Sequence, residues 1–458
     1  MIVDEFVNLK NYKVIIIGSG PAGLSLALTL EKKKINCLII ESGNEKSNVK
    51  NKYLNQNPIY HNIPYNIPQQ FGGASSIWGG NCNPLEENDF NNWPIKKSDI
   101  DKYLNSAKKI LNLKNDFIKF SLTPELDIIN LQWSNVRFQK KYLKKISKSK
   151  YIDIIFNSFF FNTTIVNNRV HKIHFIKNNK KYFINVNELV LACGGIQNSR
   201  MMLLIKKQNP NLFHDLMPIG NYYMDHPYYQ IGNGFIFKNK LQTIIKKSKF
   251  IIDCDRSVNF SLSDKYLNKF KILDSKIQFK FTELKNTFSR QLACVAPNLY
   301  KEFFFKRKQV LQAKLFIIQE QESKYQNKVF LSSKKNKNGF EEAFLDWSIS
   351  EKLKESSDDI YNKISNYLIK KKIGRITKFI NLNPEYTLGN HQIGGTRIGN
   401  HSDDSVVDKN LKVHNLENLY ITGSSIFRSS GHAHPTLTIV QLSIRLAEHL
   451  SKNYEKKI

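Results

Sequence analysis

The stretch "SSGHAHPTLT", residues 429–438, places His432 and His434 one residue apart, directly before Pro435 and Thr436. The ordinary pKa of histidine lies close to neutrality, so an imidazole can both take and give a proton near pH 7. Proline suits the first turn of a helix because its missing amide hydrogen would have no partner there. The free amides at a helix start stabilise negative charge. This stretch therefore predicts a proton carrier beside a site that favours an anion.

The residues after this stretch predict the helix itself. In "TLTIVQLSIRLAEHL", Leu437, Val440, Ile444 and Ala447 fall on one helical face. We expect this face to pack into the core and to fix the position of the two histidines.

The first fifty residues contain a nucleotide-binding pattern. The apolar run "VIII", residues 14–17, predicts a buried parallel strand, and "GSGPAG" follows it with Gly18, Gly20 and Gly23 in GxGxxG spacing. A predicted helix and a second strand that ends at Glu41 complete a βαβ unit. Gly18 permits a tight turn, Gly20 lets the backbone approach a pyrophosphate, and Gly23 allows close helix packing. Glu41 is placed to accept hydrogen bonds from an adenosine ribose, so we predict dinucleotide binding.

Four further stretches together resemble the glucose-methanol-choline (GMC) family of FAD-dependent alcohol oxidoreductases, and the bacterial members that oxidise sugars and polyols look nearest. They are "FGGASSIWGGNCNPL" (71–85), "ELVLACGGIQNSRMMLL" (188–204), "IGNYYMDHP" (219–227), and the region from "HQIGGTRIG" (391) to "LAEHL" (450). The resemblance covers about half of the chain and implies a bound FAD.

The resemblance also implies a catalytic pair, His391 and His434, which lie 43 residues apart along the chain. Oxidation of an alcohol removes a hydroxyl proton and passes a hydride to the flavin, and the proton needs a base with a pKa near neutrality. Two imidazoles at one carbinol allow one to take the proton while the other orients the oxygen. We expect His391 to be the base and His434 its partner, with the exchanged roles left open. His432 has no counterpart in the family and is expected to be a pocket or turn residue.

The remaining cofactor contacts follow from the same resemblance. Gly72 and Gly73 are expected to bring the backbone close to the flavin and its phosphates. Asn81, together with Trp78, is predicted at the flavin edge, where a turn asparagine and a packed tryptophan are the alternatives. Members with a covalent flavin have a histidine where this chain has Ile77, so we expect FAD to be held non-covalently.

Further residues near the predicted site are assigned as follows. Gly423 and Ser424 are predicted to reach the ribityl or pyrophosphate part of the cofactor, with Asp408 in a turn before them. Pro435 and Thr436 are predicted to face the pyrimidine side of the flavin. Asp225 and His226 are interpreted as structural markers of the turn that enters the substrate domain.

Composition limits the partners of the chain. The 69 Lys and Arg against 39 Asp and Glu give a formal charge of +30, but the lysines are dispersed, so we predict a solvated surface and no nucleic-acid binding. Contact with an anionic membrane face or an acidic glycan stays open. Five cysteines without a CxxC pair or a metal-ligand cluster predict no metal site and a reducing, cytoplasmic location. No apolar run is long enough for a transmembrane segment.

The predicted fold is α/β. A Rossmann-like FAD-binding domain is expected from residues 1–220 and 386–458, with an inserted α+β substrate domain, 221–385, built on an antiparallel sheet. Residues 46–70, with Pro58, Pro64 and Pro68, predict an irregular crossing loop, and residues 328–350 predict a hairpin. Phe303, Phe304 and Phe305 are expected in a core.

Two other functions remain open from sequence. A flavin-binding protein that recognises glycans without turnover is disfavoured by the histidine pair. A nicotinamide-linked flavin or disulfide reductase requires a second nucleotide-binding unit or a redox cysteine pair, and the sequence contains neither. The choice of alcohol or sugar and the electron acceptor cannot be predicted.

Overall fold

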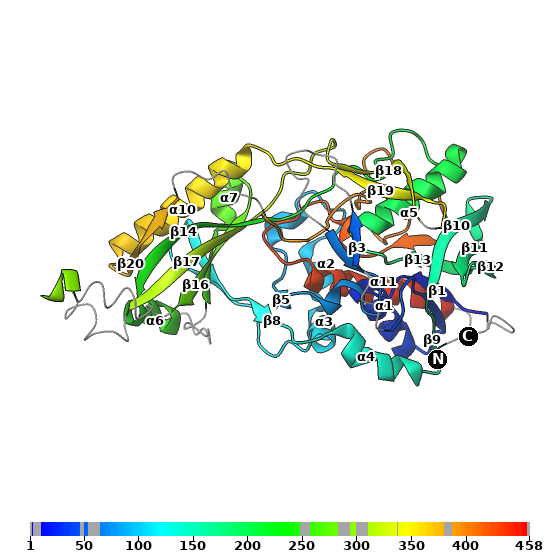
Figure 1. The fold of residues 1–458 in the computed structure, drawn as a ribbon, viewed down its shortest axis with the longest axis horizontal. Coiled ribbons are helices and arrows are strands. Elements are labelled where there is room, and N and C mark those ends of the chain that lie inside the picture. The colour runs from blue at the N-terminus through cyan, green and yellow to red at the C-terminus, as the bar shows by residue number, and fades with distance from the viewer. Residues whose placement is uncertain are drawn as a thin grey trace.

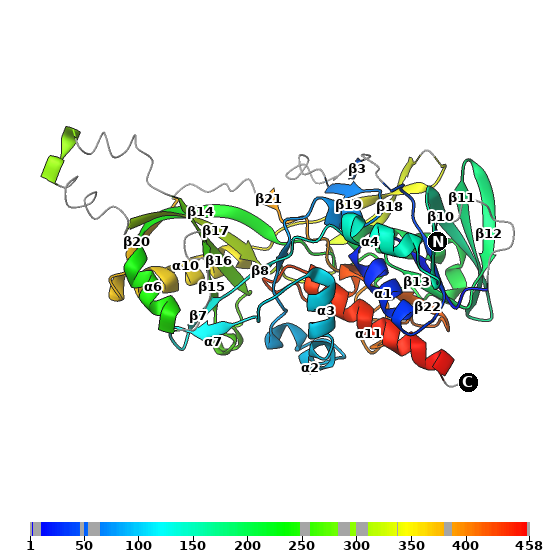
Figure 2. The same cartoon turned by 90° about the horizontal axis from the view of Figure 1, so that it is seen from below.

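The computed structural model describes Ile2 and residues 11–45, 50–53, 65–247, 257–282, 294–298, 310–336, 338–379 and 387–455. Its elements lie along one long axis, with a parallel sheet near the two chain ends and a larger antiparallel sheet toward the opposite end (Figure 1, Figure 2). Within these ranges no helix is both long enough and apolar enough to cross a bilayer. Cys254 and Phe303, Phe304 and Phe305 lie outside the described residues.

A five-stranded parallel sheet forms the centre of the first part. Its spatial order is β22 (Leu419–Ile421), β13 (Glu188–Leu191), β1 (Val14–Ile17), β2 (Cys37–Ile40) and β9 (Ile152–Ile155). Every residue of β1 and β2 is buried, as expected for parallel strands that are covered on both faces. Helix α1 (Pro21–Lys32) connects these two strands and packs against α11 (Thr436–Glu455). The predicted βαβ unit is therefore confirmed.

Further elements surround this sheet. A three-stranded antiparallel sheet, β10 (Ser158–Val166), β11 (Arg169–Lys177) and β12 (Lys180–Asn185), shares its hydrophobic core. The short strands β5 (Asn81–Cys82) and β8 (Gln132–Trp133) pair with each other and lie between the parallel and the antiparallel sheet (Figure 1). The helices of this part are α2 (Lys97–Asp101), α3 (Leu104–Leu111), α4 (Phe138–Ser147) and α5 (Gly195–Gln208), with 3-10 turns at Gly73–Ser76, Glu87–Phe90, Pro210–Leu212 and Ser424–Ile426.

The antiparallel sheet has one apolar and one polar face. Its order is β20 (Gly374–Lys378), β14 (Pro227–Phe237), β17 (Val310–Gln319), β16 (Ser275–Thr282), β15 (Ser257–Leu262), β7 (Leu126–Ile129) and β6 (Lys119–Ser121), and β21 (Thr387–Leu388) also pairs with β14. In β16, Ile277 and Phe279 join a buried cluster with α10 (Lys352–Lys370). Lys276 and Gln278 alternate with them and face the other way. Helices α6 (Lys238–Lys247) and α7 (Asp264–Phe270) complete this part.

The α/β fold class with an antiparallel second sheet is confirmed, but three details differ from the prediction. Strands β6 and β7, residues 119–129, fall in the range predicted for the FAD domain and instead extend the antiparallel sheet, because β7 pairs with β15. The predicted hairpin exists as β18 (Lys328–Lys335) and β19 (Glu341–Asp346), but it packs on α5 and does not extend the eight-stranded sheet. The predicted irregular loop 46–70 contains two paired strands, β3 (Lys50–Tyr53) and β4 (Tyr65–Pro68); Pro58 and Pro64 lie outside the described residues. The other domain boundaries stay predictions.

Candidate active site

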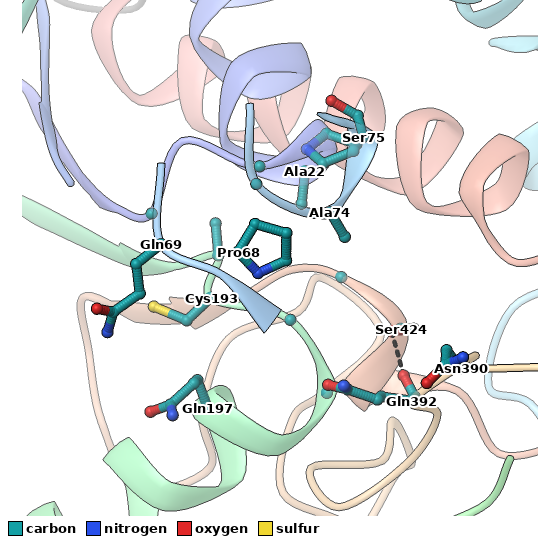
Figure 3. A pocket seen from close by; sticks show the side chains of 18 of the residues that line it. Ala22, Pro68, Gln69, Ala74, Ser75, Cys193, Gln197, Asn390, Gln392 and Ser424 are labelled. Carbon is teal, nitrogen blue, oxygen red and sulfur yellow. Dashed lines mark hydrogen bonds between the residues drawn. The ribbon is translucent and has the colours of Figure 1, made fainter. Parts of the chain in front are cut away.

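One cavity of about 1490 Å³ runs from the first glycine turn to the polar face of the antiparallel sheet. At one end it is lined by the turn after β1 and by Glu41 at the end of β2. At the other end it is lined by three histidines, His226, His391 and His434. Figure 3 shows part of the wall between these ends, where Ala22, Ala74 and Pro68 face Cys193, Gln392 and Ser424. The cavity thus joins the predicted cofactor end to the predicted catalytic end.

The glycine turn after β1 packs tightly against its neighbours and leaves the start of α1 open to the cavity. Gly18 has a φ of +101°, and a Cβ there would lie 2.7 Å from the Ala192 carbonyl oxygen. A Cβ at Gly23 would lie 2.1 Å from the Gly18 oxygen, so Gly23 serves the packing of α1 on β1 and does not line the cavity. A Cβ at Gly20 would meet nothing within 4 Å, which leaves the start of α1 open to the cavity.

Glu41 lies at the end of β2 and lines the same cavity. Its Oε2 atom accepts hydrogen bonds from the Ser19 amide (2.9 Å) and hydroxyl (2.6 Å), and its Oε1 atom accepts one from the Gly43 amide (2.8 Å). These bonds fix the carboxylate beside the glycine turn. Each carboxylate oxygen has two lone pairs, so acceptor capacity remains for the hydroxyls of a ribose.

The glycines of the second motif have different environments. Gly73 lines the cavity, and a Cβ there would lie 3.2 Å from Gly20 Cα, so this backbone passes close to the first glycine turn. Gly72 does not line the cavity. A Cβ there would lie 2.8 Å from the Gln139 amide, so the missing side chain of Gly72 admits α4, and its contact with the cofactor stays a prediction. Asn81 lines the cavity.

The two neighbours of this motif, Ile77 and Trp78, also line the cavity. The indole nitrogen of Trp78 donates a hydrogen bond to the Val136 carbonyl at 2.9 Å. That bond holds the ring as a packed wall residue, which is the alternative that the sequence left open for it. Asp408, predicted in a turn, accepts the amides of Asn410 (2.8 Å) and Lys412 (3.0 Å), and its turn role is confirmed.

A third turn, at residues 423–424, lines the cavity between its predicted cofactor end and its predicted catalytic end. Gly423 has a φ of +123°, and Gly423 and Ser424 line the cavity; their contact with the cofactor stays a prediction. The Ser424 hydroxyl donates to the Gln392 carbonyl, as the dashed line in Figure 3 marks. A Cβ at Gly195 would lie 2.6 Å from the same carbonyl oxygen. Residue 392 is therefore held from two sides, which fixes the backbone beside His391.

The structure brings His391 and His434 together on the cavity wall. Their ring centroids are 5.1 Å apart and their planes are inclined by 76°. Asn83 holds His434, because its Oδ1 atom accepts the His434 amide and lies 3.1 Å from the His434 Nδ1 atom. Pro435 and Thr436 line the cavity at the start of α11, and the predicted apolar face of that helix is buried. The sequence did not single out Asn83.

His226 contacts His391, and this contact was not predicted from the sequence. Its Nδ1 atom lies 2.7 Å from the His391 Nδ1 atom, and the ring centroids are 4.9 Å apart. Asp225 Oδ1 accepts the backbone amides of both His226 (2.7 Å) and His391 (2.9 Å). The two segments meet because Met224 pairs with Ile393 in an antiparallel bridge. These residues were interpreted as turn markers, and the structure gives them direct contact with the predicted base.

His432 is absent from the cavity wall. Its Nδ1 atom lies 2.6 Å from Asp274 Oδ2, and both side chains are buried. Lys276, on β16 near this pair, is also fully buried, and its Nζ atom has no hydrogen-bond partner among the described residues. The sequence offered no signal for this buried charged group.

Burial keeps the histidines of the cavity in their neutral form. Burial lowers the pKa of His226 to about 4, and the charge of Lys276 also lowers it. The hydrogen bonds to the carbonyls of residues 430 and 431 raise this pKa, but by less. Burial, followed by His226 and Lys276, lowers the pKa of His391 well below its usual range. Burial, followed by Lys276 and His391, does the same for His434. At neutral pH each ring has a free lone pair, so His391 and His434 can accept a proton.

The residues present fit the predicted FAD. The start of α1 is open for the pyrophosphate, and Glu41 is fixed in place for the ribose. Gly73 and Gly423 expose their backbone to the part of the cavity that lies between this nucleotide end and the histidines. Among the described residues there is no cluster of three or more potential metal ligands.

Two family models match the chain. Residues 335–443 match that of GMC oxidoreductase, and residues 12–215 match that of pyridine nucleotide-disulphide oxidoreductase. A curated relative, the fructose dehydrogenase large subunit of Gluconobacter japonicus, is 41% identical over 69 residues, which is 15% of this chain and 13% of that protein. The matched part thus spans about an eighth of the relative's length.

Solved structures resemble the whole chain in fold. Pyridoxine 4-oxidase from Mesorbium loti gives a TM-score of 0.62 at 14% identity, covering 96% of this chain and 99% of that one. A variant of formate oxidase from Aspergillus oryzae gives 0.58 at 12% identity, with 97% and 99% covered. An FAD-dependent oxidoreductase from Chaetomium thermophilum gives 0.59 at 13% identity, with 97% and 100% covered. At these identities the likeness concerns the fold.

Proposed function

We propose that this chain, an FAD-dependent oxidoreductase of the GMC family, oxidises a hydroxyl group of a sugar, polyol or other alcohol to a carbonyl. The observation that carries the proposal is the approach of the His391 and His434 rings to 5.1 Å, on the cavity that also contains the glycine turn and Glu41. Family membership rests on the C-terminal match together with the shared fold, and it agrees with the resemblance found in the motifs.

The histidines supply the proton chemistry of this reaction. One imidazole takes the hydroxyl proton, so that an O–H bond breaks and an N–H bond forms, while the other hydrogen-bonds the substrate oxygen and orients the carbinol carbon. FAD, when bound, supplies the acceptor for the hydride that leaves this carbon. Burial keeps both rings unprotonated at neutral pH, and the same low pKa makes each of them a weaker base than the pKa near neutrality expected from the sequence.

The polar face of the antiparallel sheet forms the substrate side of the cavity. Tyr228 on β14 and Gln278 and Lys280 on β16 line it, and the Lys280 Nζ atom donates to the Tyr228 hydroxyl at 2.8 Å. Amide, ammonium and phenol groups match a substrate with several hydroxyls. The short segment shared with a fructose dehydrogenase subunit favours the same class of substrate.

The cofactor is proposed to be held without a covalent link at this loop, since Ile77 provides no nucleophile. Cytoplasmic location and the electron acceptor stay open. A nicotinamide-linked disulfide reductase is a weaker candidate. The cysteines within the described residues are free, and burial raises the pKa of Cys193, which lines the cavity, to about 12. A thiol with such a pKa is a poor nucleophile.

The test is an anaerobic screen of sugars, polyols and simple alcohols for loss of the oxidised-flavin absorbance of the purified holoprotein. We expect at least one polyhydroxylated compound to bleach the flavin, and His391→Ala to slow bleaching by about 10²- to 10⁴-fold, the usual contribution of a general base. His174→Gln, on β11 and away from the cavity, is the matched control. Bleaching by a nicotinamide and by no alcohol contradicts the proposal, and an absence of bleaching by any donor favours a non-catalytic flavin protein.

A further inference from the structure

We propose that His226 is a positioning residue that holds His391 in one tautomer and thereby makes the His391 Nε2 atom the base of the reaction. The inference rests on the proposed function for its chemical meaning, but the hydrogen-bond pattern behind it does not. It resolves which of the two cavity histidines takes the proton.

The proton positions follow from the partners of His226. Its Nε2 atom lies 2.9 Å from the Gly431 carbonyl oxygen and 3.2 Å from that of Ser430. Carbonyl oxygens only accept, so Nε2 carries the hydrogen. The ring is fully buried, and burial lowers its pKa to about 4, so at neutral pH it carries no second proton. The His226 Nδ1 atom is therefore an acceptor.

The tautomer of His391 follows in turn. Its Nδ1 atom lies 2.7 Å from the His226 Nδ1 acceptor, so Nδ1 of His391 carries the hydrogen. The neutral ring then has its lone pair on Nε2, the nitrogen that remains for the cavity. Asp225 holds the two backbone segments together, because one of its oxygens accepts the backbone amides of both residues.

His434 differs from His391 in the group behind it. Asn83 Oδ1 accepts the His434 amide and therefore also accepts from Nδ1, so His434 has the same tautomer. An amide oxygen does not share a proton at neutral pH. An imidazole can share a proton. When the His391 Nε2 atom takes the hydroxyl proton, the ring becomes positively charged, and this charge is shared with His226 across their short hydrogen bond. This difference assigns the base to His391 and the orienting role to His434.

Other titratable groups also face this pair. They are Lys276 on β16, His432 and His434 in the turn before α11, and Asp225 beside His226. Lys276 lowers the pKa of both His226 and His391, so the shared charge must form against its influence.

Two substitutions separate the roles of His226. His226→Asn retains an acceptor near the position of Nδ1, and His226→Gln retains a donor near the position of Nε2 but loses the acceptor. We expect His226→Gln to slow flavin reduction by about 10- to 100-fold with KM little changed, because the acceptor that fixes the tautomer of His391 is lost. His226→Asn should restore most of the rate.

A second readout does not depend on any alcohol. In the ¹⁵N NMR spectrum of the histidine-labelled holoprotein, with His391 assigned from the His391→Asn variant, Nδ1 should give a pyrrole-type and Nε2 a pyridine-type signal. The pattern should persist in His226→Asn and in the control His174→Gln, and it should change in His226→Gln. A protonated Nε2 in the unsubstituted protein, or no change in His226→Gln, overturns the inference. If only the proposed function is wrong, no alcohol will bleach the flavin, but the NMR spectrum will still show the expected tautomer of His391.

Discussion

Replacing Lys276 by methionine should stabilise the protein at neutral pH. Lys276 is fully buried, its Nζ atom has no hydrogen-bond partner in the described part of the chain, and burial lowers its pKa from 10.5 to about 7. At about 1.4 kcal/mol per pKa unit, a shift of this size corresponds to roughly 5 kcal/mol of destabilisation. Methionine also gives up the attraction of Asp274 and Glu86 for the ammonium group, so we expect a net gain of about 1–4 kcal/mol.

The sign of this effect depends on pH. The unfolded chain holds the lysine proton up to about pH 10.5, whereas the folded protein releases it above about pH 7. The destabilisation is therefore complete below pH 7 and disappears as the pH rises toward 10.5. The stabilising effect of Lys276→Met must follow the same course.

The assay is thermal or urea unfolding of the holoprotein across this pH range, with Lys280→Met as the matched control. Lys280 lies four residues further along β16, on the same face, but is exposed, so its replacement should change stability by less than about 0.5 kcal/mol. The same substitution at Lys276 should move the acid limb of flavin reduction to higher pH, because Lys276 lowers the pKa of His391 and His434. A loss of stability in Lys276→Met at pH 7, or a gain that does not fade with rising pH, refutes the reasoning.

Three further outcomes are expected. A Cβ at Gly389 would lie 2.9 Å from the His391 Nδ1 atom, so Gly389→Ala should displace the ring and slow flavin reduction at unchanged flavin content, as single-turnover kinetics will show. Gln278→Leu should raise KM for a polyhydroxylated substrate by about 10-fold and leave kcat close to normal, because it removes uniform binding on the sheet side of the cavity. Acid precipitation should release the FAD into the supernatant, since Ile77 forms no covalent link; flavin that stays with the pellet contradicts this.

The nucleotide end of the molecule was predictable because its signals are local. The apolar run 14–17, the GxGxxG turn and Glu41 lie within thirty residues, and the structure forms the predicted strand, helix and strand from them. The start of α11 at Thr436 was predictable for the same reason, since a proline and an apolar face mark it within one segment.

The catalytic end was predictable only through the family resemblance. No periodicity or spacing brings His391 to His434, because their approach depends on the whole parallel sheet and on the turn at residues 423–424. The contact with His226 was missed because it depends on long-range antiparallel pairing between residues 224–228 and 387–393. The motif "MDHP" contained the signal, since a histidine beside an aspartate in a recognised motif is a candidate for contact with the site.

Two features could not be predicted from the sequence, for a common physical reason. A glycine in the left-handed region, such as Gly72 with a φ of +84°, reveals a close approach but not the element that approaches, which here is α4. Strands β6 and β7 contain only three and four residues, and their place in the antiparallel sheet is decided by β15, far along the chain. A local sequence pattern indicates the backbone geometry of a segment, but it does not indicate which distant helix or strand packs against that segment.

The central claim is that His391 and His434 act together on one carbinol group beside the bound cofactor. Its most direct test is anaerobic single-turnover reduction of the holoprotein by the best alcohol from the screen, prepared with hydrogen or deuterium on the carbinol carbon. Deuterium is expected to slow the loss of oxidised-flavin absorbance, and His391→Ala and His434→Ala are each expected to slow it further while FAD stays bound. Reduction that is insensitive to both the isotope and the two substitutions would contradict it.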